Sequence, residues 1–166
     1  MKQVATFSGA ARWAAPWFVG LILLAGLLIQ PADAAMRRSK LTLQTAQGAH
    51  VIDIEIAMTP AEQQMGLMFR RSVPENTGML FLYPGPQEIT MWMKDTYVSL
   101  DMVFIRGNGV VHRIEAHTEP FSQTTIPSRG DVVAVLEMVA GSAEKLGLKP
   151  GDRVVHAAFA QQRGKN

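Results

Sequence analysis

The chain of 166 residues contains no cysteine. This absence excludes disulfide cross-links, thiol nucleophiles and thiolate metal sites. Charged residues are also scarce, because they make up 18% of the chain, whereas an average protein has about 25%. A cysteine-free domain must be stabilised by its hydrophobic core, and a domain of about 130 residues is large enough to bury one.

Long hydrophobic runs are absent except for one at the N-terminus, over residues 13–29. Lys2 and Arg12 are the only charged residues before it, and the small-x-small pattern Ala-Asp-Ala follows at residues 32–34. This arrangement is typical of a secretory signal peptide and predicts an exported protein, periplasmic or secreted. The alternative is an uncleaved anchor, since the run reaches the lower limit of about 17 residues for a membrane span.

An excess of either charge is also lacking. The full chain has 16 Lys and Arg against 14 Asp and Glu; without Lys2, Arg12 and Asp33, the predicted mature chain has 14 against 13, a net charge of +1. A nucleic-acid-binding protein needs a basic face, so no nucleic-acid partner is predicted. We also expect no stable membrane span after signal cleavage. The sequence does not indicate an oligomeric state.

The expected organisation is a signal peptide at residues 1–34, a flexible leader at 35–40, one β-rich domain at 41–159 and a polar tail at 160–166. Alternation of apolar and polar residues, or short apolar runs bounded by turn residues, predicts the strands. These lie at residues 41–46, 50–57, 78–82, 88–94, 100–106, 110–116, 132–138 and 153–159.

Two short helices interrupt these strands. One starts at the capping-box residues Thr59 and Glu62, and the other is a single turn at residues 142–146. The connections are short, with no long crossover helix. The predicted fold is therefore mainly β, a small antiparallel β-barrel or sandwich with one or two short helices.

The segment 88–94 supplies the first candidate binding residues. A strand here places Met91 and Met93 on one face and Trp92 and Lys94 on the other, more polar face. An aromatic ring beside an ammonium group is typical of a binding surface. The alternative is that Trp92 packs under a loop or a second sheet, since tryptophan is usually largely buried.

Acidic residues supply the other candidates. Glu137 interrupts an apolar strand, where an unpaired charge is costly, so it needs a partner such as Arg70, Lys94 or Arg129. It forms either a structural ion pair or a pocket carboxylate. Asp101 is either a turn cap or a pocket acid. A pairing of Asp101 with Glu137 as acid and base is a further hypothesis.

Metal-binding patterns are weak. The four histidines show no metal-ligand spacing, so no metal site and no cofactor are predicted. Ten methionines are present, including Met91 and Met93. Thioethers bind Cu(I), but methionine also fills irregular cores, which is the simpler interpretation.

Several short segments occur together in a characteristic order. They are Gly66-Leu67-Met68-Phe69-Arg70, Gly78-Met79-Leu80-Phe81, Trp92-Met93-Lys94-Asp95-Thr96, Leu100-Asp101, Glu119-Pro120 and Gly147-Leu148-Lys149-Pro150-Gly151-Asp152. Over about residues 41–159 the chain resembles the family called Domain of Unknown Function 192 (UPF0127). The resemblance implies a compact, mainly β domain, often exported, and it leaves the activity open.

The leading hypothesis is a ligand-binding module. Trp92 would stack on a small molecule, Lys94 and Arg70 would pair with an anionic group, and Asp101 and Glu137 would line the site. The alternatives are a small carboxylate-dependent hydrolase or lyase, Cu(I) handling through methionines, and a structural or partner-binding domain.

Overall fold

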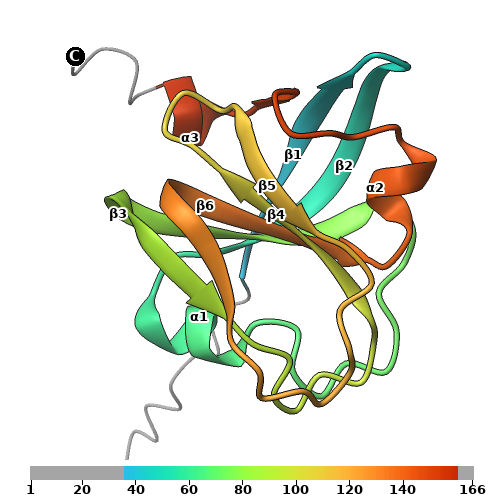
Figure 1. Ribbon diagram of the computed structural model, residues 1–166, viewed down its shortest axis with the longest axis vertical. Helices are drawn as coiled ribbons and strands as arrows, with labels where there is room; N and C mark the ends of the chain where they lie inside the picture. Colours follow the sequence, from blue (N-terminus) through green and yellow to red (C-terminus); the bar gives the residue numbers. More distant parts are fainter. Residues whose placement is uncertain (1–35, 161–166) are drawn as a thin grey trace, which may run out of the picture. The chain divides into compact units, whose positions relative to one another are not determined.

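The computed structural model describes residues 36–160, which form seven strands and three short helices (Figure 1). The strands are β1 (Arg37–Thr45), β2 (Gly48–Ala57), β3 (Thr77–Met91), β4 (Leu100–Ile105), β5 (Val111–Glu115), β6 (Ile126–Val139) and β7 (Arg153–Val155). The helices are α1 (Pro60–Met65), α2 (Ser142–Lys145) and α3 (Ala157–Ala160). The predicted signal peptide and residues 161–166 lie outside the described residues. Between residues 36 and 160, no helix is long and apolar enough to cross a bilayer.

The strands form a single sheet in the order β5-β4-β6-β3-β2-β1-β7. The pairs are antiparallel, except that β2 and β3 run parallel. A parallel pair needs a long crossover, and the segment from residue 58 to residue 76, which contains α1, provides it. The expected mainly β fold with short helices is confirmed, and the crossover makes the sheet mixed.

The sheet is strongly curled into a half-barrel. Its two edge strands approach each other, and Val110, just before β5, forms a bridge with Arg153 of β7. Around the bridge the amide of Val111 donates to the carbonyl of Asp152 (2.8 Å), and the amide of Val154 donates to Gly109 (2.7 Å). The two edges of the sheet are therefore linked at one end.

The long strand β3 replaces two predicted strands and the turn between them. Residues 83–86 were expected to form a rigid turn, but they continue the strand as an irregularity, where the β3–β6 register shifts between Leu82 and Gln87. Pro84 and Pro86 lack amide hydrogens, and a bulge is one of the few places where a strand accepts proline.

Both ends of the domain also differ from prediction. β1 begins at Arg37, within the predicted flexible leader, because residues 37–40 pair with β2 and Lys40 contacts Asp53 at 2.7 Å. At the other end, β7 stops at Val155 and α3 follows, where a strand to residue 159 was expected. The side chain of Phe159 in α3 is buried in the core, so this helix closes the domain.

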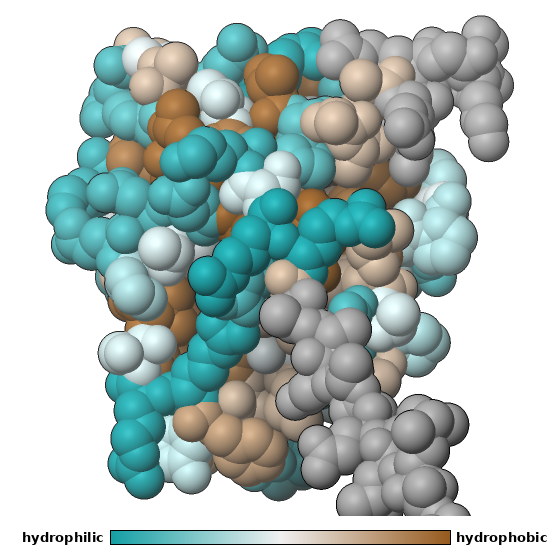
Figure 2. Space-filling view, turned by 180° about the vertical axis from the view of Figure 1, so that it is seen from behind, coloured by the Kyte–Doolittle hydropathy of each residue, from teal (hydrophilic) through white to brown (hydrophobic). Residues whose placement is uncertain are grey.

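The core consists of two clusters on opposite faces of the sheet. Alternation along each strand separates them: Leu80 and Val103 belong to one cluster, whereas Met79 and Met102 belong to the other. Ala143 of α2 and Phe159 of α3 join the first cluster. On the face of the molecule shown in Figure 2, hydrophilic side chains interrupt the hydrophobic ones.

The predicted capping box of α1 is present. The hydroxyl of Thr59 accepts from the amide of Glu62 (3.2 Å), and the Glu62 carboxylate accepts from the amide of Thr59 (2.8 Å). These bonds satisfy amides that the helix leaves without partners. They fix the start of α1 (Figure 1), and Leu67, just after the end of this helix, belongs to the second core cluster.

Candidate functional site

A row of side chains crosses the middle of the sheet on one face. Glu55 of β2 lies opposite Met79 of β3, Met79 lies opposite Glu137 of β6, and Glu137 lies opposite Met102 of β4. Directly paired residues share a face of the sheet. Two acidic side chains therefore lie on the face that carries the second core cluster, with Met79 between them.

Glu137 is 4% exposed. Among residues 36–160, no side chain forms an ion pair with it. Burial raises the pKa of Glu137 to about 8, with no cation acting against this effect. The interpretation as a structural ion pair with Arg70, Lys94 or Arg129 is therefore wrong.

The Glu137 carboxylate opens into a small hollow of about 30 Å³. Residues 63–68 of α1 and the following turn form one wall, together with Phe81 and Met91 of β3 and Trp92 and Thr96 of the next loop. No fully enclosed side-chain oxygen of the described residues lacks a hydrogen-bond partner. The oxygens of Glu137 therefore keep a small contact with this space, which we call the Glu137 hollow.

Two glycines allow close approach of the backbone, one beside Glu137 and one in the wall of the hollow. A Cβ atom on Gly78 would lie 2.5 Å from the backbone oxygen of Glu137, so only glycine lets β3 pass β6 at this point. Gly66, with φ of 47°, ends α1, and a Cβ there would meet the Phe81 ring at 3.0 Å. The lack of a side chain at these two positions lets β3 lie close to the backbone of Glu137 and lets the end of α1 lie close to Phe81.

Trp92 lies at the hollow with 48% of its surface exposed. β3 ends at Met91, so Trp92 belongs to the next loop, although the alternation continues: Met93 is buried, and Trp92 and Lys94 are exposed. The alternative in which Trp92 is buried by packing is therefore wrong. Lys94 is not among the residues that line the hollow, so Glu137, not Lys94, shares this space with the indole.

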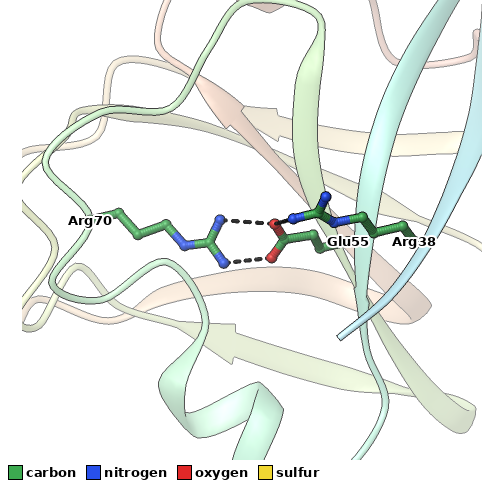
Figure 3. Close-up of polar contacts among 3 residues, drawn as sticks. All are labelled: Arg38, Glu55 and Arg70. Carbon is green, nitrogen blue, oxygen red and sulfur yellow. Dashed lines mark hydrogen bonds and ion pairs between the residues drawn. The ribbon is translucent and has the colours of Figure 1, made fainter. Parts of the chain in front are cut away.

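Arg70 forms a different pair, shown in Figure 3. Its guanidinium donates two hydrogen bonds to the Glu55 carboxylate (3.2 and 2.5 Å), and Arg38 approaches the same carboxylate at 3.7 Å. The hydrogen bond from Arg70 lowers the pKa of Glu55. The three residues line a separate cavity of about 400 Å³, and Leu67 lies between it and the Glu137 hollow.

Asp101 has a structural role. It is fully buried, and its carboxylate accepts hydrogen bonds from the amides of His117 (3.0 Å) and Ala143 (2.9 Å). Glu137 pairs with Met102, and Asp101 pairs with Met138, so the two carboxylates face opposite sides of the sheet. The hypothesis of an acid–base pair between Asp101 and Glu137 is therefore wrong.

Methionine occurs both in the core and around the hollow. Met93 is fully buried and contacts the hydroxyl of Thr118 (3.1 Å), whereas the sulfur of Met91 contacts the hydroxyl of Tyr83 (3.8 Å). Met65, which is half-exposed, and Met68 line the hollow with Met91. Cu(I) handling stays a prediction that these contacts do not test.

Exposed aromatic rings lie on the loops next to the hollow. Tyr97 and Phe121 pack edge to face with ring centroids 4.9 Å apart, and Arg71 lies 5.4 Å from the Tyr97 ring. These rings and Trp92 leave apolar surface open to solvent. The hypothesis of a partner-binding domain stays a prediction.

The wall formed by residues 63–68 was missed by the sequence reasoning. The capping box located α1 correctly, but it carried no information about which strand the helix would cover. That position depends on the path of the crossover over residues 58–76, which lets the consecutive strands β2 and β3 pair in parallel. The signal that did indicate the site was the single carboxylate in the apolar strand at residue 137.

The model of the DUF192 family, described as "Uncharacterized ACR, COG1430", matches residues 42–156. The chain belongs to this family. Two solved structures are similar to it. One, from Sinorhizobium meliloti 1021 and described as "a putative transcription regulator", is 38% identical with a TM-score of 0.74; the match covers 76% of this chain and 98% of that one.

The second structure is a protein of unknown function from Novosphingobium aromaticivorans DSM 12444. It is also 38% identical, with a TM-score of 0.72, and the match covers 76% of this DUF192 chain and 89% of the other. No curated protein matches the chain. The family membership thus establishes the fold and leaves the activity of the DUF192 domain to be inferred from its site.

Proposed function

We propose that this DUF192 protein is a binding module that takes part of a small molecule into the Glu137 hollow, with Trp92 against the ligand. The observation that carries the proposal is the nearly complete burial of an acidic side chain that has no ion-pair partner among residues 36–160 and opens into a hollow. Buried polar groups are nearly always satisfied in folded proteins. Strongly perturbed carboxyls in a concave site therefore mark candidate functional sites.

The arrangement differs from the site expected from the sequence. Lys94 and Arg70 were expected to bind an anionic group, but Arg70 is engaged by Glu55, and Lys94 lies outside the hollow. The residues that meet at the hollow are instead Trp92 and Glu137. We therefore place the ligand contact on the indole and the carboxyl group.

The description of the S. meliloti protein raises nucleic-acid binding as a competing function. Among residues 36–160, five basic side chains already have acidic partners. They are Arg38, Lys40, Arg70, Arg113 and Lys145. Nucleic-acid recognition depends on a free basic face, so we favour a small-molecule ligand. From residues 13–34 we also propose that binding occurs outside the cytoplasm.

The proposal is tested by the fluorescence of Trp92 in a chain that carries Trp13→Phe and Trp17→Phe, which leaves one tryptophan of three. We expect at least one member of a metabolite and glycan panel to give a saturable change. Glu137→Gln should weaken that response by about tenfold or more, as the loss of a charge-assisted contact does.

Lys94→Gln is the matched control, since Lys94 is exposed beside Trp92 but does not line the hollow. It should leave the response unchanged. The proposal fails if no compound alters the fluorescence, or if Glu137→Gln and the parent chain respond equally.

A further inference from the structure

We infer that the Glu137 hollow receives a primary ammonium group, so that the ligand is a compound with an unbranched aminoalkyl end. This inference rests on the proposed binding function and names the chemical class of the ligand. It depends on three properties of the hollow: the kind of atoms that line it, its volume and its charge.

The lining is rich in electron-donating groups. Glu137 contributes a carboxyl group, Trp92 an indole ring, and Met65, Met68 and Met91 polarisable thioether side chains. The other polar lining residues are two glutamines and Thr96, which carry no charge. A cation is attracted by a carboxylate and by the face of a tryptophan, whereas a second anion would be repelled.

The volume restricts the shape of the cation. A site needs about 10–15 Å³ to hold one water molecule, and the hollow has about 30 Å³. An ammonium group is close in size to water, so the hollow accommodates it. A trimethylammonium or a guanidinium group occupies more space than one water molecule, so we expect each to fit beside Glu137 less well than an ammonium group does.

The unpaired carboxyl group of Glu137 favours a ligand group that is positively charged. Among residues 36–160, no cationic residue lines the hollow, and Glu55, on the same face beyond Met79, is already paired with Arg70. The nearby Tyr83 hydroxyl stays neutral, because burial and the Glu137 charge raise its pKa to about 12. A bound ammonium thus supplies the counter-charge that no side chain of residues 36–160 gives to Glu137.

Binding should be linked to proton release. Burial raises the pKa of Glu137 to about 8, so near pH 7 most of the free protein carries this carboxyl in its neutral form. An alkylammonium keeps its charge up to about pH 10. When it enters, the carboxyl proton leaves to solvent and an ion pair remains, so the affinity increases from pH 6 to pH 8.

The experiment compares butylammonium, tetramethylammonium and 1-butanol as probes at constant ionic strength, with Trp92 fluorescence as the readout. Butylammonium should bind with saturation, and the other two should bind at least about tenfold more weakly, as expected for a contact that depends on charge and fit. Calorimetry in two buffers of different ionisation enthalpy should show proton release at pH 7. Glu137→Gln should lose both the binding and the proton release, and Lys94→Gln should retain both.

Two further probes distinguish the sources of such a group. 1,5-Diaminopentane represents a free amine, and Nα-acetyl-lysine amide represents a lysine side chain of a peptide. Binding of either supports the inference, and the tighter one identifies the source. Equal binding of butanol or tetramethylammonium, or unchanged binding of butylammonium to Glu137→Gln, overturns the inference. If amines fail while another compound gives a Glu137-dependent response, the inference alone is wrong; if no compound responds, the binding function is wrong as well.

Discussion

Replacement of Glu137 by glutamine should increase the stability of the folded domain at pH 8 and leave it almost unchanged near pH 4.5. In the unfolded chain this carboxyl titrates near 4.5, whereas burial raises its pKa to about 8 in the folded domain. Between these values the folded state holds a proton that the unfolded state has released. The stability of the parent protein therefore falls as the pH rises, by at most about 1.4 kcal/mol per pH unit.

Glutamine has nearly the same shape and no such titration. The variant should thus be more stable than the parent by roughly 3–5 kcal/mol at pH 8. Urea unfolding of the full chain at several pH values between 4.5 and 8.5 measures the difference. A difference in the free energy of unfolding that stays constant across this range would show that Glu137 is not held in its neutral form.

Glu55→Gln is the matched comparison, with the opposite sign. The hydrogen bond from Arg70 lowers the pKa of Glu55, so its contribution is present above pH 4.5 and is lost as the pH falls below that value. The variant should be less stable than the parent at neutral pH, by about 1–2 kcal/mol, between the values for exposed and buried pairs. This difference should shrink in acid.

Replacement of Asp101 by alanine should have an effect of similar size in the other direction. Its carboxylate accepts from the amides of His117 and Ala143, and all of its surface is buried. Truncation leaves two amides without partners, and each unsatisfied buried group costs about 1–3 kcal/mol. We expect the free energy of unfolding to fall by roughly 3–5 kcal/mol, because a cavity is added to this loss.

Asp53→Ala provides the control for Asp101. Asp53 pairs with Lys40 on the surface, where both side chains are more than half exposed, so its removal should cost less than about 1 kcal/mol. Equilibrium unfolding of the two variants at pH 7 gives the comparison. Equal losses from Asp101→Ala and Asp53→Ala would contradict the structural role of Asp101.

Local sequence patterns predicted many of the strands and the start of α1, because these features are determined by residues that are close in the sequence. The alternation along residues 88–94 correctly predicted that Ile89 and Met93 face the core, and the Thr59–Glu62 capping box predicted the start of α1. The merging of two strands into β3 was not predicted, because Pro84 and Pro86 suggest a turn unless a bulge accommodates them.

The candidate site was predicted only in part, because many of its contacts join residues that are far apart in the sequence. Glu137 and Trp92 were selected by local anomalies: a carboxylate in an apolar strand, and a large ring on a polar face. The partner of Arg70 is Glu55, on a strand before α1, and period-two patterns do not specify such pairings. Asp101 was expected to line the same site as Glu137, but it lies on the opposite face of the sheet, because the β4–β6 register decides which side chains share a face.

The bridge between Val110 and Arg153 has a consequence for solubility. Unpaired strand edges allow other chains to add to a sheet, and this is a route to aggregation. In the described domain the edge strands β5 and β7 have only five and three residues, and each edge is partly covered by the other. Curvature of the sheet therefore leaves fewer edge backbone groups free to pair with another molecule. The domain obtains this protection without a disulfide, which a cysteine-free chain cannot form.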